Sequence, residues 1–299
     1  MKYIKFDNQN ISKLSLGTVQ FGLDYGIANS NGKPLQKDVD RIIEYVSNNG
    51  INCFDTAQAY GNSEQVLGES LKNIDEKIVI SKLKSNIFRE NLNINITKSL
   101  KNLNLSSLFG LLLHDSDILY DWKSEDTKSV NHLIDSKKIK YFGVSIYTSR
   151  DFELAIENEN IKFIQIPFNL FDQRAYKENW FEKAKKNNKL IFIRSIYLQG
   201  LLLMEKNKVP SNLESAKKYL DILDKYCKKL NITRNELSLS FVDTIAKDSM
   251  ILFGCENITQ AEENIKNYNN LNKLDVEIIY NLTEELSAIN EKIYNPTKW

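Results

Sequence analysis

Four polar side chains that could take part in proton transfer stand where short apolar segments end. Asp55 directly follows an apolar run that ends at Phe54, Lys82 ends the segment IVISK, and His114 ends the segment GLLLH. Tyr60 lies a few residues beyond Asp55. A tyrosine hydroxyl is a reluctant acid with a pKa of about 10, but an adjacent ammonium stabilises the phenolate and lowers that pKa.

The four side chains have complementary chemistry. Asp55 would hold Lys82 charged and oriented, and Lys82 would lower the pKa of Tyr60. Tyr60 would then donate a proton to an oxygen that gains negative charge, while His114 would hydrogen-bond to the same oxygen and place it. A carbonyl oxygen is of this kind when the carbonyl carbon receives hydride from a nicotinamide. The set therefore predicts reductive chemistry on a carbonyl.

Two kinds of segment alternate along the chain and would position these side chains. Apolar residues at helical spacing, such as Val39, Ile42, Ile43 and Val46, predict helices. Helices are expected at about 38–50, 63–71, 91–101, 125–135, 149–157, 178–186 and 259–268, with two more between 213 and 246. Short apolar runs predict buried strands at 14–18, 51–54, 77–82, 108–114, 139–145, 161–167, 190–195 and 250–254.

This alternation predicts the fold class. Buried strands that alternate with helices favour a parallel sheet covered by helices. Eight such units favour a closed (β/α)8 barrel, since the early Gly-rich turn of a doubly wound sheet is missing. Residues 1–12 predict a β-hairpin that caps the bottom of the barrel. No linker-like segment divides the chain, so we expect one domain over residues 1–299.

The barrel prediction places the polar strand ends at one site. In such barrels the working face lies at the carboxyl ends of the strands. Besides the four residues above, Ser145, Gln165, Arg194 and Ser195 stand at or next to strand ends. Each side chain alone has a simpler interpretation: Asp55 could cap the helix that begins near residue 63, and a lone tyrosine or lysine is usually structural. The ordered combination favours the active-site interpretation.

Several motifs resemble the aldo/keto reductase superfamily. They are LSLGTVQFG at 14–22, DTAQAYGNSEQVLG at 55–68, ISK at 80–82, LLLHD at 111–115, FGVS at 142–145 and IQIPFN at 164–169. The block that begins at Asp55 is the most specific of them. The resemblance implies that Tyr60 is the general acid, that Lys82 and Asp55 modulate it, and that His114 orients the substrate. It also implies NADP(H), or alternatively NAD(H), as cofactor.

The resemblance extends to the residues that would hold the cofactor. Ser145 and Gln165 would bind the nicotinamide carboxamide. The full set of cofactor-binding candidates is Gly17, Thr18, Ser145, Gln165, Arg194, Ser195, Leu198, Gly200, Gly254, Glu256, Glu263 and Asn264.

The chain also departs from the family pattern. Ile146 stands where many relatives have an Asn, and Arg194 stands where an aromatic residue often stacks on the nicotinamide. A planar guanidinium can also stack on a flat ring. Glu256 stands where relatives that favour NADP usually carry a basic residue. Its carboxylate would repel a 2′-phosphate and accept a hydrogen bond from a 2′-hydroxyl. NADH is therefore the alternative to NADPH as cofactor.

The substrate is expected to be a small carbonyl compound. The segments 16–34 and 193–203 are similar to a branch of the family associated with bacterial surface-polysaccharide synthesis, which suggests a keto-sugar. Phe21, Tyr25, Tyr147 and Phe171 are candidates to line its pocket, and each could alternatively pack the barrel rim. The alternatives for function are a catalytically silent barrel that senses the cofactor, and a lyase or isomerase that works without nicotinamide.

Composition excludes several other classes of function. The 299 residues carry 40 Lys+Arg and 39 Asp+Glu, a net charge of +1 with no long basic run, so neither nucleic acid nor an anionic membrane is an expected partner. Three widely separated cysteines and the lack of a long apolar segment favour a reduced, cytoplasmic protein. No metal site is expected, because the two histidines fit no ligand motif.

Overall fold

The barrel in the computed structural model, which describes residues 1–299, is built from eight parallel strands. The strands are β3 (Leu14–Gly17), β4 (Cys53–Asp55), β5 (Ile78–Leu83), β6 (Leu108–Leu113), β7 (Ile139–Ser145), β8 (Phe163–Pro167), β9 (Leu190–Arg194) and β10 (Met250–Gly254). Each strand pairs with the next in sequence, and β10 pairs with β3 to close the ring. All eight strands lie where the sequence predicts them, so the predicted (β/α)8 class is confirmed.

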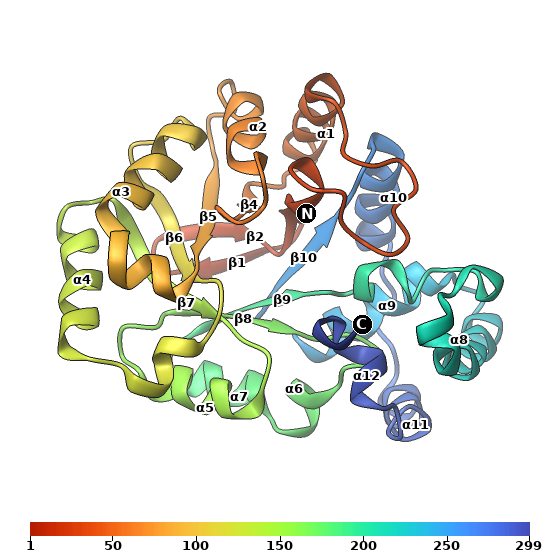
Figure 1. Cartoon of the computed structure of the whole chain (residues 1–299). Coiled ribbons are helices and arrows are strands. Elements are labelled where there is room, and N and C mark those ends of the chain that lie inside the picture. Colours follow the sequence, from red (N-terminus) through yellow and green to blue (C-terminus); the bar gives the residue numbers. More distant parts are fainter.

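Helices surround the strands (Figure 1). They are α1 (Gln36–Asn48), α2 (Ser63–Ser70), α3 (Ser85–Leu103), α4 (Ser124–Asp135), α5 (Ser149–Glu157), α6 (Arg174–Lys177), α7 (Trp180–Lys186), α8 (Lys217–Leu230), α9 (Arg234–Ile245), α10 (Ile258–Asn269), α11 (Val276–Glu285) and α12 (Glu291–Tyr294). Their apolar faces cover the barrel: the four apolar residues of α1 that show helical spacing are all fully buried. None of the helices is long and apolar enough to cross a membrane.

Three helical features differ from the prediction. Helix α3 starts at Ser85, upstream of the predicted start, and contains a non-helical residue, Asn91, with φ −139°. The short helix α6 precedes α7, and helices α11 and α12 follow the last predicted element. Helix α11 packs Ile278, Ile279 and Leu282 into the core. Val276, at its first position, is 84% exposed.

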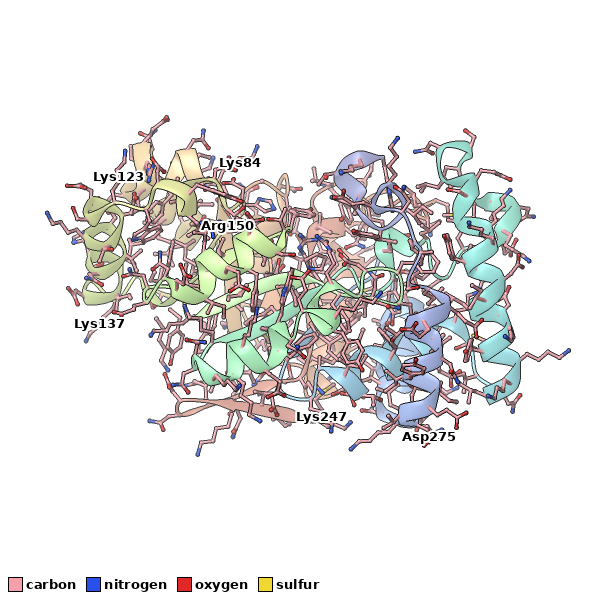
Figure 2. All side chains as sticks on the ribbon, turned by 90° about the horizontal axis from the view of Figure 1, so that it is seen from below. Lys84, Lys123, Lys137, Arg150, Lys247 and Asp275 are labelled. Atoms are coloured by element: carbon pink, nitrogen blue, oxygen red, sulfur yellow. The ribbon has the colours of Figure 1, made fainter.

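An antiparallel hairpin precedes the barrel, as predicted. Its strands are β1 (Tyr3–Phe6) and β2 (Gln9–Ser12), which are joined by a two-residue turn. In this turn Asp7 adopts φ 49°, which lets the chain reverse tightly. Ile11 is fully buried and belongs to the same apolar cluster as the interior residues of the barrel. The hairpin thus closes the barrel bottom, seen as the faint red ribbon at the lower edge of Figure 2.

The pleat of the strands determines which residues reach the opposite, open end. The barrel interior holds an apolar layer of Cys53, Ile80, Leu112, Phe163, Phe192 and Leu252. Because side chains alternate along a strand, the residues two positions later point toward the same interior. These residues are Asp55, Lys82, His114, Gln165, Arg194 and Gly254.

Figure 2 shows the direction of the strands. Lys84 and Arg150, which follow β5 and β7, lie in the upper half of that view, whereas Lys137 and Lys247, which precede β7 and β10, lie in the lower half. The polar layer that follows the apolar interior therefore lies at the upper end, away from the hairpin. The fold brings six separate strand ends to one place.

Candidate active site

A cavity of about 520 Å³ opens at the carboxyl ends of the strands, a size typical of small-molecule and cofactor sites. Most residues singled out from the sequence line it: Gly17, Thr18, Tyr25, Asp55, Tyr60, His114, Ser145, Tyr147, Gln165, Arg194, Ser195, Gly200, Gly254, Glu256, Glu263 and Asn264. The structure therefore gathers them around one space.

Lys82 is fully buried beneath this cavity and joins two of the predicted catalytic residues. Its Nζ donates hydrogen bonds to Asp55 Oδ2 at 2.6 Å and to the backbone oxygen of Thr56 at 2.9 Å. It also lies 3.4 Å from the hydroxyl of Tyr60. The three side chains form one continuous chain of contacts, and only Tyr60 and Asp55 among them reach the cavity wall.

The pKa of Tyr60 differs from the expectation. Burial raises it, and the charge of Asp55 adds to that rise, while Lys82 and Arg194 act in the opposite direction. Lys82 lowers the pKa as expected, but burial outweighs it, so the net shift is upward. Burial likewise opposes the charge of Lys82, yet Asp55 and Tyr60 together raise its pKa above the ordinary value. At neutral pH the site therefore holds a protonated tyrosine beside a charged ammonium.

His114 completes the set next to Tyr60. The two ring centroids are 5.4 Å apart with an interplanar angle of 81°. Burial, aided by the nearby cations Lys82 and Arg194, lowers the pKa of His114 to about 4. Its Nδ1 is buried and has no hydrogen-bond partner in the protein. The imidazole is therefore neutral at physiological pH and keeps hydrogen-bonding capacity for a ligand.

Asp55 is fixed from two sides. Gln165 donates a hydrogen bond from Nε2 to Asp55 Oδ1 at 2.9 Å, and Lys82 binds the other carboxylate oxygen. The simpler interpretation of Asp55 as a helix cap is wrong, because the residue at the start of α2 is Asn62 and no side chain caps this helix. Gln165 keeps its amide oxygen free to accept a further hydrogen bond.

Arg194 lies against Tyr147 on the cavity wall. Its guanidinium carbon is 4.1 Å from the centroid of the Tyr147 ring, a cation–π contact. Nη2 donates to the backbone oxygen of Ile146 at 3.1 Å, and Nη1 to the hydroxyl of Ser195 at 3.3 Å. Within the chain this guanidinium therefore stacks on a tyrosine. That the guanidinium also stacks on a nicotinamide stays a prediction.

The far side of the cavity is formed by β10 and the start of α10. A Cβ at Gly254 would lie 2.7 Å from the side-chain amide of Gln20, so a larger residue there would require this amide to move. Glu256 lines the cavity, and burial raises its pKa. It does not cap α10, because Asn257 does so by accepting from the backbone N–H of Gln260 at 3.0 Å.

Four of the predicted site residues do not line the cavity: Lys82, which lies buried beneath it, and three apolar residues. Phe21 and Phe171, candidates for the substrate pocket, are 0% and 3% exposed and belong to the main hydrophobic core. Phe171 packs edge-on against Tyr219. Leu198, a cofactor candidate, is 1% exposed and belongs to the same core. The reason is common to all three: an apolar loop residue gains more from burial than from a wet cavity wall.

Sequence reasoning missed other residues on the cavity wall. They are Val19, Gln20, Gly26, Ala28, Ile196, Tyr197, Gln199, Leu203, Met204, Asn235, Leu252, Phe253 and Gln260. The hydroxyl of Tyr197 contacts Asn264 and lies 3.1 Å from Asn235 Oδ1. Tyr197, Gln199 and their neighbours could have been predicted as site residues from the sequence, because they stand in the loop after β9. Asn235 gave no local signal, because α9 brings it from a distant part of the chain.

Known proteins resemble this chain along its whole length. Residues 13–284 match the Aldo/keto reductase family. A curated relative, the NADH-specific methylglyoxal reductase of Escherichia coli (strain K12), is 22% identical over an alignment that covers 96% of this chain and 99% of the relative.

Solved structures give the same result for the fold. Aldo-keto reductase AKR11C1 from Bacillus halodurans in its holo form superposes with a TM-score of 0.78 at 19% identity and covers 100% of this chain and 99% of its own. An aldo/keto reductase from Klebsiella pneumoniae in complex with NADP and acetate gives 0.73 at 17% identity, with 95% of each chain covered. Since the family match spans most of the sequence, the chain belongs to the aldo/keto reductase family and is an NAD(P)H-dependent oxidoreductase.

Proposed function

We propose that this protein reduces an aldehyde or ketone to the alcohol, with Tyr60 as the general acid. The observation that carries the proposal is the buried chain Asp55, Lys82, Tyr60, in which Lys82 Nζ lies 2.6 Å from the carboxylate and 3.4 Å from the hydroxyl. When bound, a reduced nicotinamide supplies hydride to the carbonyl carbon. The electron pair of the carbonyl bond moves to the oxygen, which takes its proton from Tyr60.

The raised pKa of Tyr60 suits this role. A protonated hydroxyl is an acid at neutral pH, and the buried ammonium of Lys82 stabilises the phenolate that forms when the proton leaves. His114, neutral because burial lowers its pKa to about 4, would hydrogen-bond to the same oxygen. Each step uses a group that the cavity presents in the required protonation state.

The residues present fit a nicotinamide dinucleotide. Ser145 and Gln165 stand together on the wall, and the free amide oxygen of Gln165 can accept from a carboxamide N–H. Across the cavity, Gln20 Oε1 is buried without a hydrogen-bond partner beside Gly254. In the loop after β9, Ser195 and Gly200 adopt φ of 61° and 91°. This loop and Thr18, at the end of β3, would hold the phosphates and ribose.

We propose that Glu256 disfavours NADPH relative to NADH. Glu256 lines the cavity two residues beyond the end of β10. A second carboxylate, that of Glu263, also lines the cavity and comes from α10. A 2′-phosphate at this end would meet negative charge, whereas a 2′-hydroxyl would donate a hydrogen bond. The named relatives differ in their cofactor: the Escherichia coli enzyme is NADH-specific, and the Klebsiella pneumoniae structure contains NADP.

The substrate class we propose is a small hydroxylated carbonyl compound such as a keto-sugar. Tyr25 and Tyr147 line the cavity together with the catalytic groups. Aromatic rings with a polar end suit a ligand that has both apolar faces and hydroxyl groups. Burial raises the pKa of Tyr25 to about 12, so its hydroxyl stays protonated and can donate a hydrogen bond.

One experiment separates the reductase from a silent cofactor sensor. The purified protein is titrated with NADH and with NADPH by fluorescence, and carbonyl compounds, beginning with methylglyoxal and a panel of aldoses and ketoses, are then added. We expect oxidation of the bound cofactor that depends on the carbonyl compound. Tight cofactor binding with no oxidation by any member of the panel would favour the sensor.

A further inference from the structure

Arg194 is the only cation among the residues that line the cavity. The imidazole of His114 is neutral, and the other ionisable groups that carry charge there are the carboxylates Asp55, Glu256 and Glu263. Asp55 is already paired with the buried Lys82 at 2.6 Å. Arg194 forms no ion pair with any carboxylate of the chain. The cavity therefore contains a positive charge that the protein itself leaves without a counter-ion.

The chain holds this guanidinium in place. Arg194 follows Phe192 by two positions in β9, so it extends the interior face of the barrel. The ring of Tyr147 lies 4.1 Å from the guanidinium carbon, and Ile146 and Ser195 accept one hydrogen bond each. A guanidinium has five N–H donors, so these two bonds leave three for a ligand. The group is fixed in position and still has hydrogen bonds to make.

The position of Arg194 is at the reacting end of the cavity. Tyr60, His114 and Tyr147 line the same space. The charge of Arg194 acts to lower the pKa of both Tyr60 and His114, although burial has the larger effect on each. A half-buried cation without a counter-ion is costly unless a ligand supplies an anion. Carboxylate and phosphate are the anions whose geometry matches a guanidinium fork.

We propose that the substrate carries a carboxylate or phosphate close to its carbonyl group, and that Arg194 binds this oxyanion and selects for it. The inference deepens the proposed function and rests on it. The carbonyl would face Tyr60 and His114 while its anionic substituent meets Arg194. Anionic carbonyl compounds, such as 2-oxo acids and phosphorylated or carboxylated sugars, form the predicted substrate class.

The first test measures binding without turnover. Oxamate has a carboxylate next to an amide that hydride does not reduce, and oxamide is its neutral counterpart. Calorimetric titration of both into the NADH-loaded protein should show affinity for oxamate that falls roughly 10- to 100-fold in Arg194→Gln, as expected for a charge-assisted hydrogen bond. Arg194→Lys, which keeps the charge, should recover part of it. Arg150→Gln is the matched control, because Arg150 is exposed at the same end of the barrel.

The second test compares matched substrates. Pyruvate and methyl pyruvate differ by the carboxylate charge, and dihydroxyacetone phosphate and dihydroxyacetone by the phosphate. For each pair, the ratio of kcat/KM for the charged member to that for the neutral member should fall roughly 10- to 100-fold in Arg194→Gln. The pair with the larger fall identifies the preferred anion. An unchanged ratio in both pairs overturns the proposal.

The outcomes separate this inference from the proposed function. Arg194-dependent binding of oxamate by a protein that reduces no carbonyl compound would support the anion site and refute the reductase. Carbonyl reduction with equal losses for charged and neutral substrates, together with weaker NADH binding in Arg194→Gln, would refute the anion site and assign Arg194 to the cofactor. Loss of oxamate binding in Arg150→Gln as well would show a general charge effect and also refute the site.

Discussion

Replacing Lys82 by Met removes the charge at the centre of the site and keeps most of the side-chain length. Lys82 and Asp55 are 1% and 4% exposed, and their charged groups lie 2.6 Å apart. The variant leaves a buried carboxylate without its counter-ion. Removing one partner of a buried ion pair typically costs about 3–5 kcal/mol, so we expect the free energy of unfolding to fall by about that amount.

Urea denaturation of the parent and the variants measures this loss. Lys185→Met is the control, because its ion pair with Asp248 has a similar length of 2.8 Å but side chains that are 64% and 66% exposed. That variant should change stability little, since exposed pairs contribute little. Adding Asp55→Asn to Lys82→Met removes the unpaired charge and should restore part of the stability. If Lys82→Met is no less stable than Lys185→Met, the buried pair does not have the role assigned to it.

The pH dependence has a definite sign. Burial opposes the charge of Lys82, but Asp55 and Tyr60 raise its pKa above 10.5. Its contribution to stability is therefore fully present below pH 10.5 and is lost only as the pH rises through the higher folded-state pKa. The stability deficit of Lys82→Met relative to the parent should therefore persist at neutral pH and shrink as the pH rises through the folded-state pKa of Lys82.

Three further predictions follow from other parts of the structure. Glu256→Arg should raise the affinity for NADPH relative to NADH by about tenfold or more, because a guanidinium matches the 2′-phosphate; an affinity ratio unmoved in fluorescence titrations would remove Glu256 from the cofactor site. Because burial lowers the pKa of His114 to about 4, carbonyl reduction should stay level as the pH falls through 6.5 and decline only near pH 4; a decline centred at 6.5 would contradict this. Ile11→Ala, at the fully buried position of the hairpin, should lower the free energy of unfolding by about 2–5 kcal/mol, whereas Val276→Ala at an 84% exposed position should not. Equal effects would mean that the hairpin does not plug the barrel.

The sequence was sufficient to predict the barrel and the gathering of its strand ends. The reason is local: each buried strand is a short apolar run, and the polar residue that follows, such as Asp55 or His114, marks the end of the apolar interior. The pleat of the strands then determines which side chains point into the barrel interior. Lys82 and Gln165 do so because they stand two positions beyond interior apolar residues. The site residues at strand ends can therefore be predicted from the local sequence, without information on tertiary contacts.

Loops and long-range contacts could not be predicted in the same way. Phe21 and Phe171 stand in loops at the correct end of the barrel, but their side chains turn into the core. Asn235 reaches the cavity only because α9 packs beside the loop that holds Tyr197. The net pKa of Tyr60 depends on how deeply it is buried, which no sequence pattern expresses.

The central claim is that Tyr60 donates the proton, and Tyr60→Phe tests it most directly. Reduction of methylglyoxal, or of the best carbonyl compound from the panel, should fall by about 10²-fold or more, while fluorescence titration should show little change in cofactor affinity. Tyr25→Phe, which removes another cavity hydroxyl but one without an adjacent lysine, should have a much smaller effect. A Tyr60→Phe variant that reduces its carbonyl substrate at the parent rate would contradict the account.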